Sequence, residues 1–352
     1  AKQFGFCYGV ERAIDMAYAA RKVFPDQRLF ILGEIIHNPD VNRQIAEMKI
    51  TNLVGKDRRA DLSVLTEEDV VIVPAFGAEV NTVEAVRELG CTIVDTTCGD
   101  VMSVWRRVKQ NASEGVTSII HGKADHEETR ATASRALGRG NGHFLVVLNL
   151  EETEIVCRYI REGGDAKAFL ARFDGAYSPG FDPEMHLKRI GVANQTTMLR
   201  GETEEIQRRL REAILQRDGP EEGSLNFRFF DTICGATQER QDALFEMLEE
   251  KQDLLLVVGG YNSSNTTHLA EIGSEVLPTY FILNASCIES GDIIRHYDFH
   301  QKKEVTTTGW LPSGDAVVGI TAGASCPNSL IEETILRVFA LRGIGREAIL
   351  SA

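Results

Sequence analysis

Three cysteines in similar surroundings are the residues of this chain best suited to chemistry. Cys98 and Cys234 lie in two stretches that nearly repeat each other, VDTTCG and FDTICG. Cys7 lies in a third stretch, GFCYGV, which also opens a helical pattern. Three thiolates that meet at one centre commonly hold a metal ion or an iron–sulfur cluster. We therefore expect these cysteines to share one metal site, built by three related parts of the chain.

The position of each cysteine just before a helix favours the thiolate. Free N–H groups and the helix dipole stabilise negative charge at a helix start. Asp95 and Asp231, with the threonines that follow them, are typical of turns and caps. Each cysteine taken alone also fits as a small buried residue beside glycine. The matching context of all three favours a metal site, and a cluster with three protein ligands leaves one iron open to substrate.

The other four cysteines do not share this context. We interpret Cys91, Cys157 and Cys287 as packing residues, and Cys326 as a buried neighbour of Ser325. The total of seven is odd and the spacing is sparse, which disfavours a disulfide framework. The chain has no C-x-x-C pair, which excludes zinc-ribbon and bacterial-ferredoxin patterns.

Two loops rich in small polar residues suit an anion. NSSN follows a Gly-Gly turn after an apolar run, and TAGAS follows another apolar run. Hydroxyls, amides and backbone N–H groups at helix starts bind phosphate oxygens, whereas plain helix capping is the alternative for each loop. The chain has neither a Walker lysine nor a G-x-G-x-x-G fingerprint, so a nucleotide fold is not indicated. The candidate phosphate-binding residues are Ser263, Ser264, Asn265 and Ser325.

Four further polar residues lie in loops that follow apolar runs: His37, His126, Glu128 and Thr196. An imidazole can donate to phosphate oxygens. A glutamate can deliver a proton when burial raises its pKa, and a threonine can position a hydroxyl group. The alternatives are surface histidines, a first-turn glutamate favoured by the helix dipole, and a threonine cap. We expect His121 to pack against its own turn.

Apolar runs alternate with helical patterns along the chain, which predicts an α/β fold with mostly parallel, buried strands. Ligands of such sheets gather at the carboxyl ends of the strands, where all of these polar loops lie. We expect three pseudo-repeated α/β lobes around a central cluster site, and a surface insertion with a helical piece near 150–183. The expected lobes are residues 1–97 with Cys7, 98–230 with Cys98 and the insertion, and 231–352 with Cys234.

The composition is that of an ordinary globular protein, with 352 residues, 43% of them hydrophobic, and a formal net charge of −14. This charge disfavours nucleic-acid binding, but helix starts still bind small anions. No apolar run approaches the roughly 20 residues that span a bilayer, and no signal-peptide pattern opens the chain. We expect no membrane or nucleic-acid partner and a cytoplasmic location. The alternative location is the plastid stroma after removal of a transit peptide.

Eight ordered motifs together resemble the LytB-type 4-hydroxy-3-methylbut-2-enyl diphosphate reductases of the non-mevalonate isoprenoid pathway. The resemblance runs from Gly5 to about Glu333, nearly the whole chain. The motifs are GFCYGV at 5–10, EIIHNP at 34–39, DTTC at 95–98, HEE at 126–128, NQTT at 194–197, DTIC at 231–234, NSSN at 262–265 and TAGAS at 321–325.

The resemblance implies one 4Fe–4S cluster with an open iron, an allylic diphosphate substrate, and ferredoxin or flavodoxin as electron donor. The implied reaction removes the allylic hydroxyl with two electrons and gives isopentenyl and dimethylallyl diphosphate. Glu128 is then the proton-relay acid, and Thr196 helps to place the substrate hydroxyl. The implied cluster ligands are Cys7, Cys98 and Cys234, and the implied diphosphate site is His37, His126, Ser263, Ser264, Asn265 and Ser325.

The chain departs from the family pattern at two positions. Phe76 stands where many members have a histidine in the diphosphate site, so that contact is lost or replaced. The Ala-Phe-Gly pattern around it and the stretch at 150–183 resemble the cyanobacterial and plastid branch. Gly99 stands where proline usually follows the cysteine, and glycine gives that turn more freedom. It bears on the rigidity of Cys98, not on its role as a ligand.

Two other functions also fit the residues. A dehydratase resembling quinolinate synthase also uses an open-site cluster but needs no electron donor, so dependence on a reductant separates it from a reductase. A non-redox phosphate-binding protein with a structural metal is the other alternative, and it lacks the brown colour of an iron–sulfur cluster after anaerobic purification.

Overall fold

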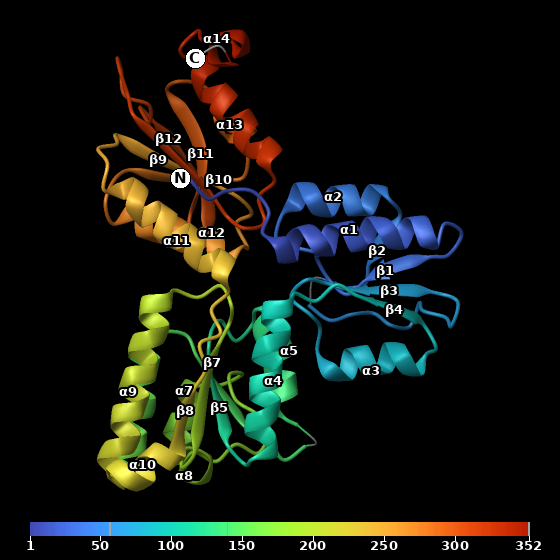
Figure 1. Cartoon of the computed structure of the whole chain (residues 1–352), viewed down its shortest axis with the longest axis vertical. Helices are drawn as coiled ribbons and strands as arrows, with labels where there is room; N and C mark the ends of the chain where they lie inside the picture. The colour runs from blue at the N-terminus through green and yellow to red at the C-terminus, as the bar shows by residue number, and fades with distance from the viewer. Residues whose placement is uncertain (56–57, 139, 351–352) are drawn as a thin grey trace. The chain divides into compact units, whose positions relative to one another are not determined.

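The computed structural model describes residues 1–55, 58–138 and 140–350, and within them it contains three β-sheets (Figure 1). The α/β class with mostly parallel strands is confirmed. The described residues divide into two compact units. Unit 1 contains Ala1–Glu11, Ile36–Ile45 and the described residues from Gly235 onward, and unit 2 contains Arg12–Ile35 and the described residues from Ala46 to Cys234.

The first sheet lies in unit 2 and is entirely parallel, in the order β2-β1-β3-β4. Leu29 of β1 pairs with Ile50 of β2 and with Val70 of β3, and these pairs define the register of the three strands. The helices α1 and α3 cover opposite faces (Figure 1), so the central strands are buried and apolar. The strands are β1 (Leu29–Ile31), β2 (Ile50–Asn52), β3 (Val70–Val73) and β4 (Thr92–Asp95), and the helices of this part of the chain are α1 (Tyr8–Val23), α2 (Pro39–Glu47) and α3 (Val80–Glu88).

The second sheet, also in unit 2, is parallel in the order β6-β5-β7-β8. The helices α4 and α5 lie on one side of it and α9 on the other (Figure 1). Ile190 of β7 pairs with Thr117 of β5 and with Phe227 of β8, so these three strands begin at the same level of the sheet. The strands are β5 (Thr117–His121), β6 (Phe144–Val147), β7 (Ile190–Asn194) and β8 (Phe227–Phe229), and the helices are α4 (Gly99–Ser113), α5 (Glu127–Ala136), α6 (Leu150–Glu162), α7 (Ala166–Arg172), α8 (Pro183–His186), α9 (Arg200–Asp218) and α10 (Pro220–Asn226).

The stretch near 150–183 has the helical structure expected of it, but it is not confined to the surface, and its being an insertion stays a prediction. Three helices, α6, α7 and α8, form there or begin there, and α6 packs against α9. Their apolar side chains belong to the core under the second sheet, where Phe173 and Cys157 are fully or almost fully buried. The glycines of this stretch and most of its charged residues are exposed, which is why composition alone suggested a surface element.

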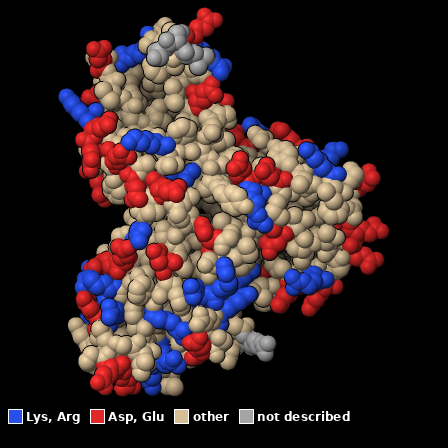
Figure 2. Space-filling model, viewed as in Figure 1, with Lys and Arg blue, Asp and Glu red and all other residues tan. Residues whose placement is uncertain are grey.

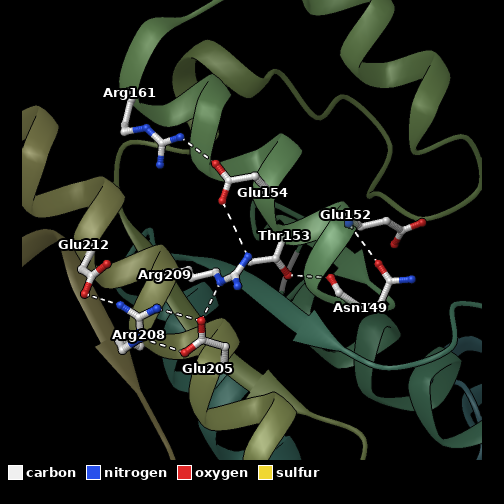
Figure 3. A network of polar contacts seen from close by, with 9 residues as sticks. All are labelled: Asn149, Glu152, Thr153, Glu154, Arg161, Glu205, Arg208, Arg209 and Glu212. Atoms are coloured by element: carbon white, nitrogen blue, oxygen red, sulfur yellow. Dashed lines mark hydrogen bonds and ion pairs between the residues drawn. The ribbon is translucent and has the colours of Figure 1, made fainter.

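Ion pairs lie along the outer rim of the α6–α9 contact (Figure 3). Glu205 receives hydrogen bonds from Arg208 and Arg209, which hold its pKa at about 2. Arg209 also lies 3.9 Å from Glu154 on α6. Exposed pairs of this kind contribute little stability individually, so the buried apolar residues beneath them hold the two helices together.

The third sheet lies in unit 1, in the order β12-β11-β10-β9-β13. Strand β9 is parallel to β10 and β13, whereas β11 and β12 form an antiparallel edge. Leu256 packs with α13, while Leu255 approaches Gly273 of α12, so these helices cover opposite faces. The elements are α11 (Gly235–Leu248), β9 (Leu254–Val258), α12 (Ser264–Ser274), β10 (Thr279–Ile282), η1 (Ala285–Cys287), β11 (Ile293–Asp298), β12 (Lys303–Thr308), β13 (Val318–Ala322), α13 (Asn328–Ala340) and α14 (Arg346–Leu350).

Each of the three sheets falls within one of the expected lobes, while the boundaries at 97/98 and 230/231 stay a prediction. Among the described residues, no helix is both long and apolar enough to cross a membrane. The polar loops expected to carry the chemistry leave the carboxyl ends of parallel strands, including β3, β5, β7, β9 and β13.

The loop after β3 depends on one glycine. Gly77 has φ +80°, and a Cβ there would lie 2.2 Å from the ring of Trp105, which is buried. We predict that Gly77→Ala lowers the free energy of unfolding by about 3 kcal/mol, because a left-handed conformation and overpacking both count against alanine. Denaturant unfolding monitored by circular dichroism measures this.

The control is Gly115→Ala. Gly115 has φ +66°, but its Cβ would meet nothing within 4 Å. Gly115→Ala should therefore lower the free energy of unfolding by only about 1 kcal/mol, the cost of alanine in the left-handed conformation. Equal losses in the two variants would show that the Trp105 contact does not constrain the loop.

Candidate functional site

The backbone N–H group of each candidate ligand cysteine makes the same kind of hydrogen bond. Cys98 N–H donates to the carbonyl of Ala75 at 3.0 Å, two residues past the end of β3. Cys234 N–H donates to the carbonyl of Thr196 at 3.1 Å, two residues past the end of β7. In both cases the receiving strand is the parallel neighbour of the strand that leads to the cysteine.

Cys7 follows the same rule without a strand of its own before it. Its N–H group donates to the carbonyl of Ala324 at 3.1 Å, two residues past the end of β13. The amino group of Ala1 donates to the carbonyl of Ile320 within β13. Residues 1–6 therefore run beside β13, as β4 runs beside β3 before Cys98 and β8 runs beside β7 before Cys234.

Each of these cysteines is the residue immediately before a helix, as expected: α1, α4 and α11 begin at the next residue. All three are partly exposed, whereas the other four cysteines are buried, as expected for packing residues. Burial raises the pKa of the Cys157 and Cys326 thiols to about 12, which disfavours the thiolate that binds metal. Cys7 lies in unit 1, and Cys98 and Cys234 lie in unit 2.

The two Asp-Thr turns differ in how they hold their cysteine. Asp95 accepts hydrogen bonds from the N–H and hydroxyl groups of Thr97 at 2.9 and 2.5 Å, as expected for a turn residue. In the second turn Asp231 instead forms an ion pair with Arg200 at 3.5 Å. There Thr232 holds the loop, because its hydroxyl donates to Oδ1 of Asn194 at the end of β7 at 2.5 Å.

Gly99, where the chain departs from the family pattern, is the first residue of α4. Its φ angle is not in the left-handed region, and a Cβ there would meet nothing within 4 Å. Glycine is therefore not required sterically at this position. The Cys98 N–H bond to the strand loop still fixes the turn.

Glu128 and Thr196 form one hydrogen-bonded pair in unit 2. The N–H group of Thr196 donates to Oε1 of Glu128 at 2.6 Å, and the Thr196 hydroxyl donates to Oε2 at 3.0 Å. Glu128 is 1% exposed, so it is not a solvated first-turn glutamate. Burial raises its pKa to about 7, and the nearby Asp100 carboxylate adds to the rise while the Thr196 bonds oppose it.

Three residues beside this pair were not singled out from the sequence. Oε1 of Gln195 accepts from the Thr129 hydroxyl and from the N–H group of Lys123, while its Nε2 donates to Thr197. This network fixes the turn that carries Thr196. Gln195 and Thr197 lie in the NQTT motif, which was the available signal, whereas nothing in the sequence marks Thr129.

Phe76 packs against His126 in unit 2, edge to face, with ring centroids 5.9 Å apart. His126 is the N-cap of α5, and its Nδ1 accepts the N–H group of Glu128 at 3.2 Å. A neutral imidazole that accepts at Nδ1 carries its proton on Nε2. Phe76 thus constrains the ring of His126 in place of making a polar contact of its own.

The second histidine has the same tautomer. In unit 1, Nδ1 of His37 accepts from the side-chain amide of Asn262 at 3.2 Å, which leaves the proton on Nε2. The Ser325 hydroxyl donates to the His37 carbonyl at 3.3 Å. Asn38, which sequence reasoning missed although it lies in the EIIHNP motif, donates to the Ser325 carbonyl at 2.9 Å.

The start of α12 completes the polar group of unit 1. Ser263 is the N-cap, and its hydroxyl accepts from Thr266, so its capping role is present. Ser264 and Asn265 follow it and are 3% and 2% exposed. Neither polar atom of the Asn265 amide has a hydrogen-bond partner among the described residues. A buried unpaired amide costs about 1 to 3 kcal/mol, so this position fits a bound polar ligand.

The structure thus brings the predicted site residues together in two groups. His37, Ser263, Ser264, Asn265, Ser325 and Cys7 meet around the ends of β9 and β13 in unit 1. Glu128, Thr196, His126, Cys98 and Cys234 lie around the ends of β3, β5 and β7 in unit 2. His121 belongs to neither group: it is fully buried, and its Nδ1 lies 2.8 Å from the Thr203 hydroxyl.

Comparisons with known proteins agree on one family. The family described as LytB protein matches residues 1–339. The chain is 50% identical over 350 residues to the 4-hydroxy-3-methylbut-2-enyl diphosphate reductase of Gloeobacter violaceus, covering 98% of this chain and 83% of that protein. It is 49% identical to the protein of the same name from Thermosynechococcus vestitus, with coverage of 98% and 84%.

Two solved structures are also similar. The structure of an (E)-4-hydroxy-3-methyl-but-2-enyl diphosphate reductase, described as the terminal enzyme of the non-mevalonate pathway, has a TM-score of 0.56 at 26% identity and 96% coverage of both chains. A reductase from Plasmodium falciparum has a TM-score of 0.68 at 20% identity, covering 94% of this chain and 84% of that one, which supports the fold alone. With the family match and these relatives over nearly its whole length, the chain belongs to the LytB protein family.

Proposed function

We propose that this chain removes the allylic hydroxyl of (E)-4-hydroxy-3-methylbut-2-enyl diphosphate and yields isopentenyl and dimethylallyl diphosphate. Family membership supports this, as do curated relatives named as reductases of that diphosphate. The observation that carries the proposal is the bonding of Thr196. Its N–H and hydroxyl groups hold the buried Glu128 carboxyl, and its carbonyl accepts the N–H group of Cys234. An acid of raised pKa beside a candidate cluster ligand is what this reaction requires.

We infer that Cys7, Cys98 and Cys234 hold a 4Fe–4S cluster with one iron open to substrate. Three partly exposed thiols, each at a helix start, fit such a group. When bound, the cluster supplies electrons and a Lewis-acidic iron. The electrons come from a ferredoxin or flavodoxin in the cytoplasm or the plastid stroma. The lobes 1–97, 98–230 and 231–352 each contribute one cysteine.

The residues of the chain account for the proton that leaves with the hydroxyl. The reaction consumes two electrons and two protons, breaks one C–O bond, forms one C–H bond and releases water. Burial raises the pKa of Glu128 to about 7, so this carboxyl keeps its proton to higher pH than an exposed glutamate does and can protonate the departing hydroxyl. The Thr196 hydroxyl is fixed by its hydrogen bond to Glu128 and orients the hydroxyl group of the substrate.

N–H and O–H donors of both units are proposed to bind the diphosphate. His37 and His126 each carry an Nε2–H group, because Nδ1 is already an acceptor. Ser263, Ser264 and Asn265 add side-chain donors and the N–H groups at the start of α12, and Ser325 adds a hydroxyl. The Asn265 amide, which has no partner among the described residues, gains one when the anion binds.

We predict that Cys98→Ser abolishes cluster retention, because a serine hydroxyl is a much poorer iron ligand than a thiolate. Iron content and the visible absorption of anaerobically purified protein measure this. Cys91→Ser, seven residues earlier and buried with its thiol donating to the Thr66 carbonyl, serves as the control and should keep its iron. Full iron loading and activity in Cys98→Ser would show that Cys98 is not a cluster ligand.

We predict that Glu128→Gln keeps substrate binding but lowers kcat by roughly 10² to 10⁴, the usual contribution of a general acid. Glutamine can still accept the N–H group of Thr196, so the loop should stay in place. Steady-state kinetics with a chemical reductant measure kcat and KM separately. Glu151→Gln, at an exposed first-turn glutamate of α6, is the matched control. Unchanged turnover in Glu128→Gln would remove Glu128 from its role.

The raised pKa of Glu128 also predicts a pH dependence. A proton donor must be protonated, and Glu128 loses its proton as the pH rises through about 7. We therefore expect kcat of the wild type to fall above about pH 7, and the residual kcat of Glu128→Gln to lack that descending limb. If kcat falls above about pH 7 in the same way in the wild type and in Glu128→Gln, the fall belongs to another titrating group.

A further inference from the structure

Positively charged side chains gather on one helix of unit 2, although the chain as a whole has a net charge of −14. Figure 2 shows Lys and Arg side chains over the part of unit 2 where Figure 1 has α4 and β7. On α4, Arg106, Arg107 and Lys109 are exposed. Arg106 and Lys109 share a face with the exposed Met102, at spacings of four and seven residues.

The charges of these three residues are not neutralised locally. Other arginines of unit 2 form ion pairs, as Arg208 and Arg209 do with Glu205. In contrast, no carboxylate among the described residues pairs with Arg106, Arg107 or Lys109. The acidic residues of α4 lie at its two ends: Asp100 in the first turn, and Glu114 just past the last, paired with Arg228 at 2.8 Å.

This surface adjoins two candidate cluster ligands. Cys98 directly precedes α4, so Arg106 and Arg107 follow it by about 12 to 14 Å along the helix axis. The guanidinium of Arg107 lies 4.7 Å from the ring centroid of Phe230, which is four residues before Cys234. We call Met102, Arg106, Arg107 and Lys109 the basic surface.

We propose that the basic surface docks an acidic protein that carries one electron at a time to the cluster site. The proposal rests on the proposed function, which consumes two electrons per substrate that the residues of the chain do not supply. Two reduced carriers are then oxidised in each turnover, while the substrate loses its hydroxyl as water and gains one hydrogen on carbon. Unpaired cations around an exposed methionine are complementary to an acidic partner.

Electrostatic docking of this kind has a definite salt dependence. Attraction between opposite charges raises the association rate, and salt screens it over about 10 Å at 0.1 M. The affinity for the carrier should therefore fall as salt rises. The same salt should have much less effect on turnover supported by a small reductant such as methyl viologen.

The test uses the holoenzyme and the double variant Arg106→Glu/Lys109→Glu. Both side chains are exposed and unpaired among the described residues, so the fold should be kept, which thermal unfolding checks. The probe is a plant-type ferredoxin. Its Kd is measured by calorimetry, and turnover is measured with ferredoxin or methyl viologen as donor. Lys167→Glu, which reverses an exposed charge on α7, is the control.

We expect the double variant to bind ferredoxin about tenfold more weakly or worse, with a flatter salt dependence, and to keep its turnover with methyl viologen within about twofold. The control should match the wild type. Unchanged ferredoxin binding and turnover in the double variant overturn the proposal. A raised KM for the diphosphate with both donors also overturns it, because the surface then steers the anionic substrate.

Failure of the proposed function is distinguishable from these results. A wild-type enzyme with an intact cluster that reduces no allylic diphosphate with either donor contradicts the function. The calorimetric Kd for ferredoxin does not depend on turnover and still reports whether the basic surface docks the carrier.

Discussion

The backbone N–H group of each candidate ligand cysteine donates to a carbonyl two residues past the end of a parallel strand. For Cys98 and Cys234 this bond continues the pairing of two parallel strands by one step, and in all three cases a helix begins at the next residue. It fixes the backbone of Cys7, Cys98 and Cys234 without using the sulfur atoms. Three separate segments thus present a cysteine in the same local backbone geometry without a C-x-x-C motif, which is what the proposed cluster site needs.

Thr196 connects this geometry to Glu128, the proposed proton donor. The carbonyl that receives the Cys234 N–H group belongs to the residue whose N–H and hydroxyl groups hold Glu128. Any shift of that turn moves the acid and the cysteine loop together. Burial keeps the Glu128 pKa near 7, and the unpaired Asn265 amide in unit 1 is another buried polar group held at a cost in stability. Such features are expected where a site is arranged for a ligand and not for stability alone.

Much of this arrangement could be predicted from the sequence, because strand-end loops have strong local signals. The apolar run before Cys98, the Asp-Thr turn and the polar helix after it each point to one geometry. Contacts between distant segments carried no such signal. The hydrogen bond from Thr129 to Gln195 and the packing of Phe76 on His126 arise only when two loops meet. The burial of side chains in the stretch at 150–183 was not predicted, because its buried residues, such as Phe173, are scattered among charged residues that face solvent.

The proposed function depends on three equivalent cysteine loops that hold one cluster with an open iron. The most direct measurement is a crystal structure of the anaerobically purified protein, with anomalous scattering recorded at the iron absorption edge. We expect one four-iron cluster bound by the Sγ atoms of Cys7, Cys98 and Cys234, at the roughly 2.3 Å typical of metal–thiolate bonds, and one iron without a protein ligand. A cluster bound by Cys326 or any other residue in place of one of these three, or a fully loaded protein whose iron lies elsewhere, would contradict it.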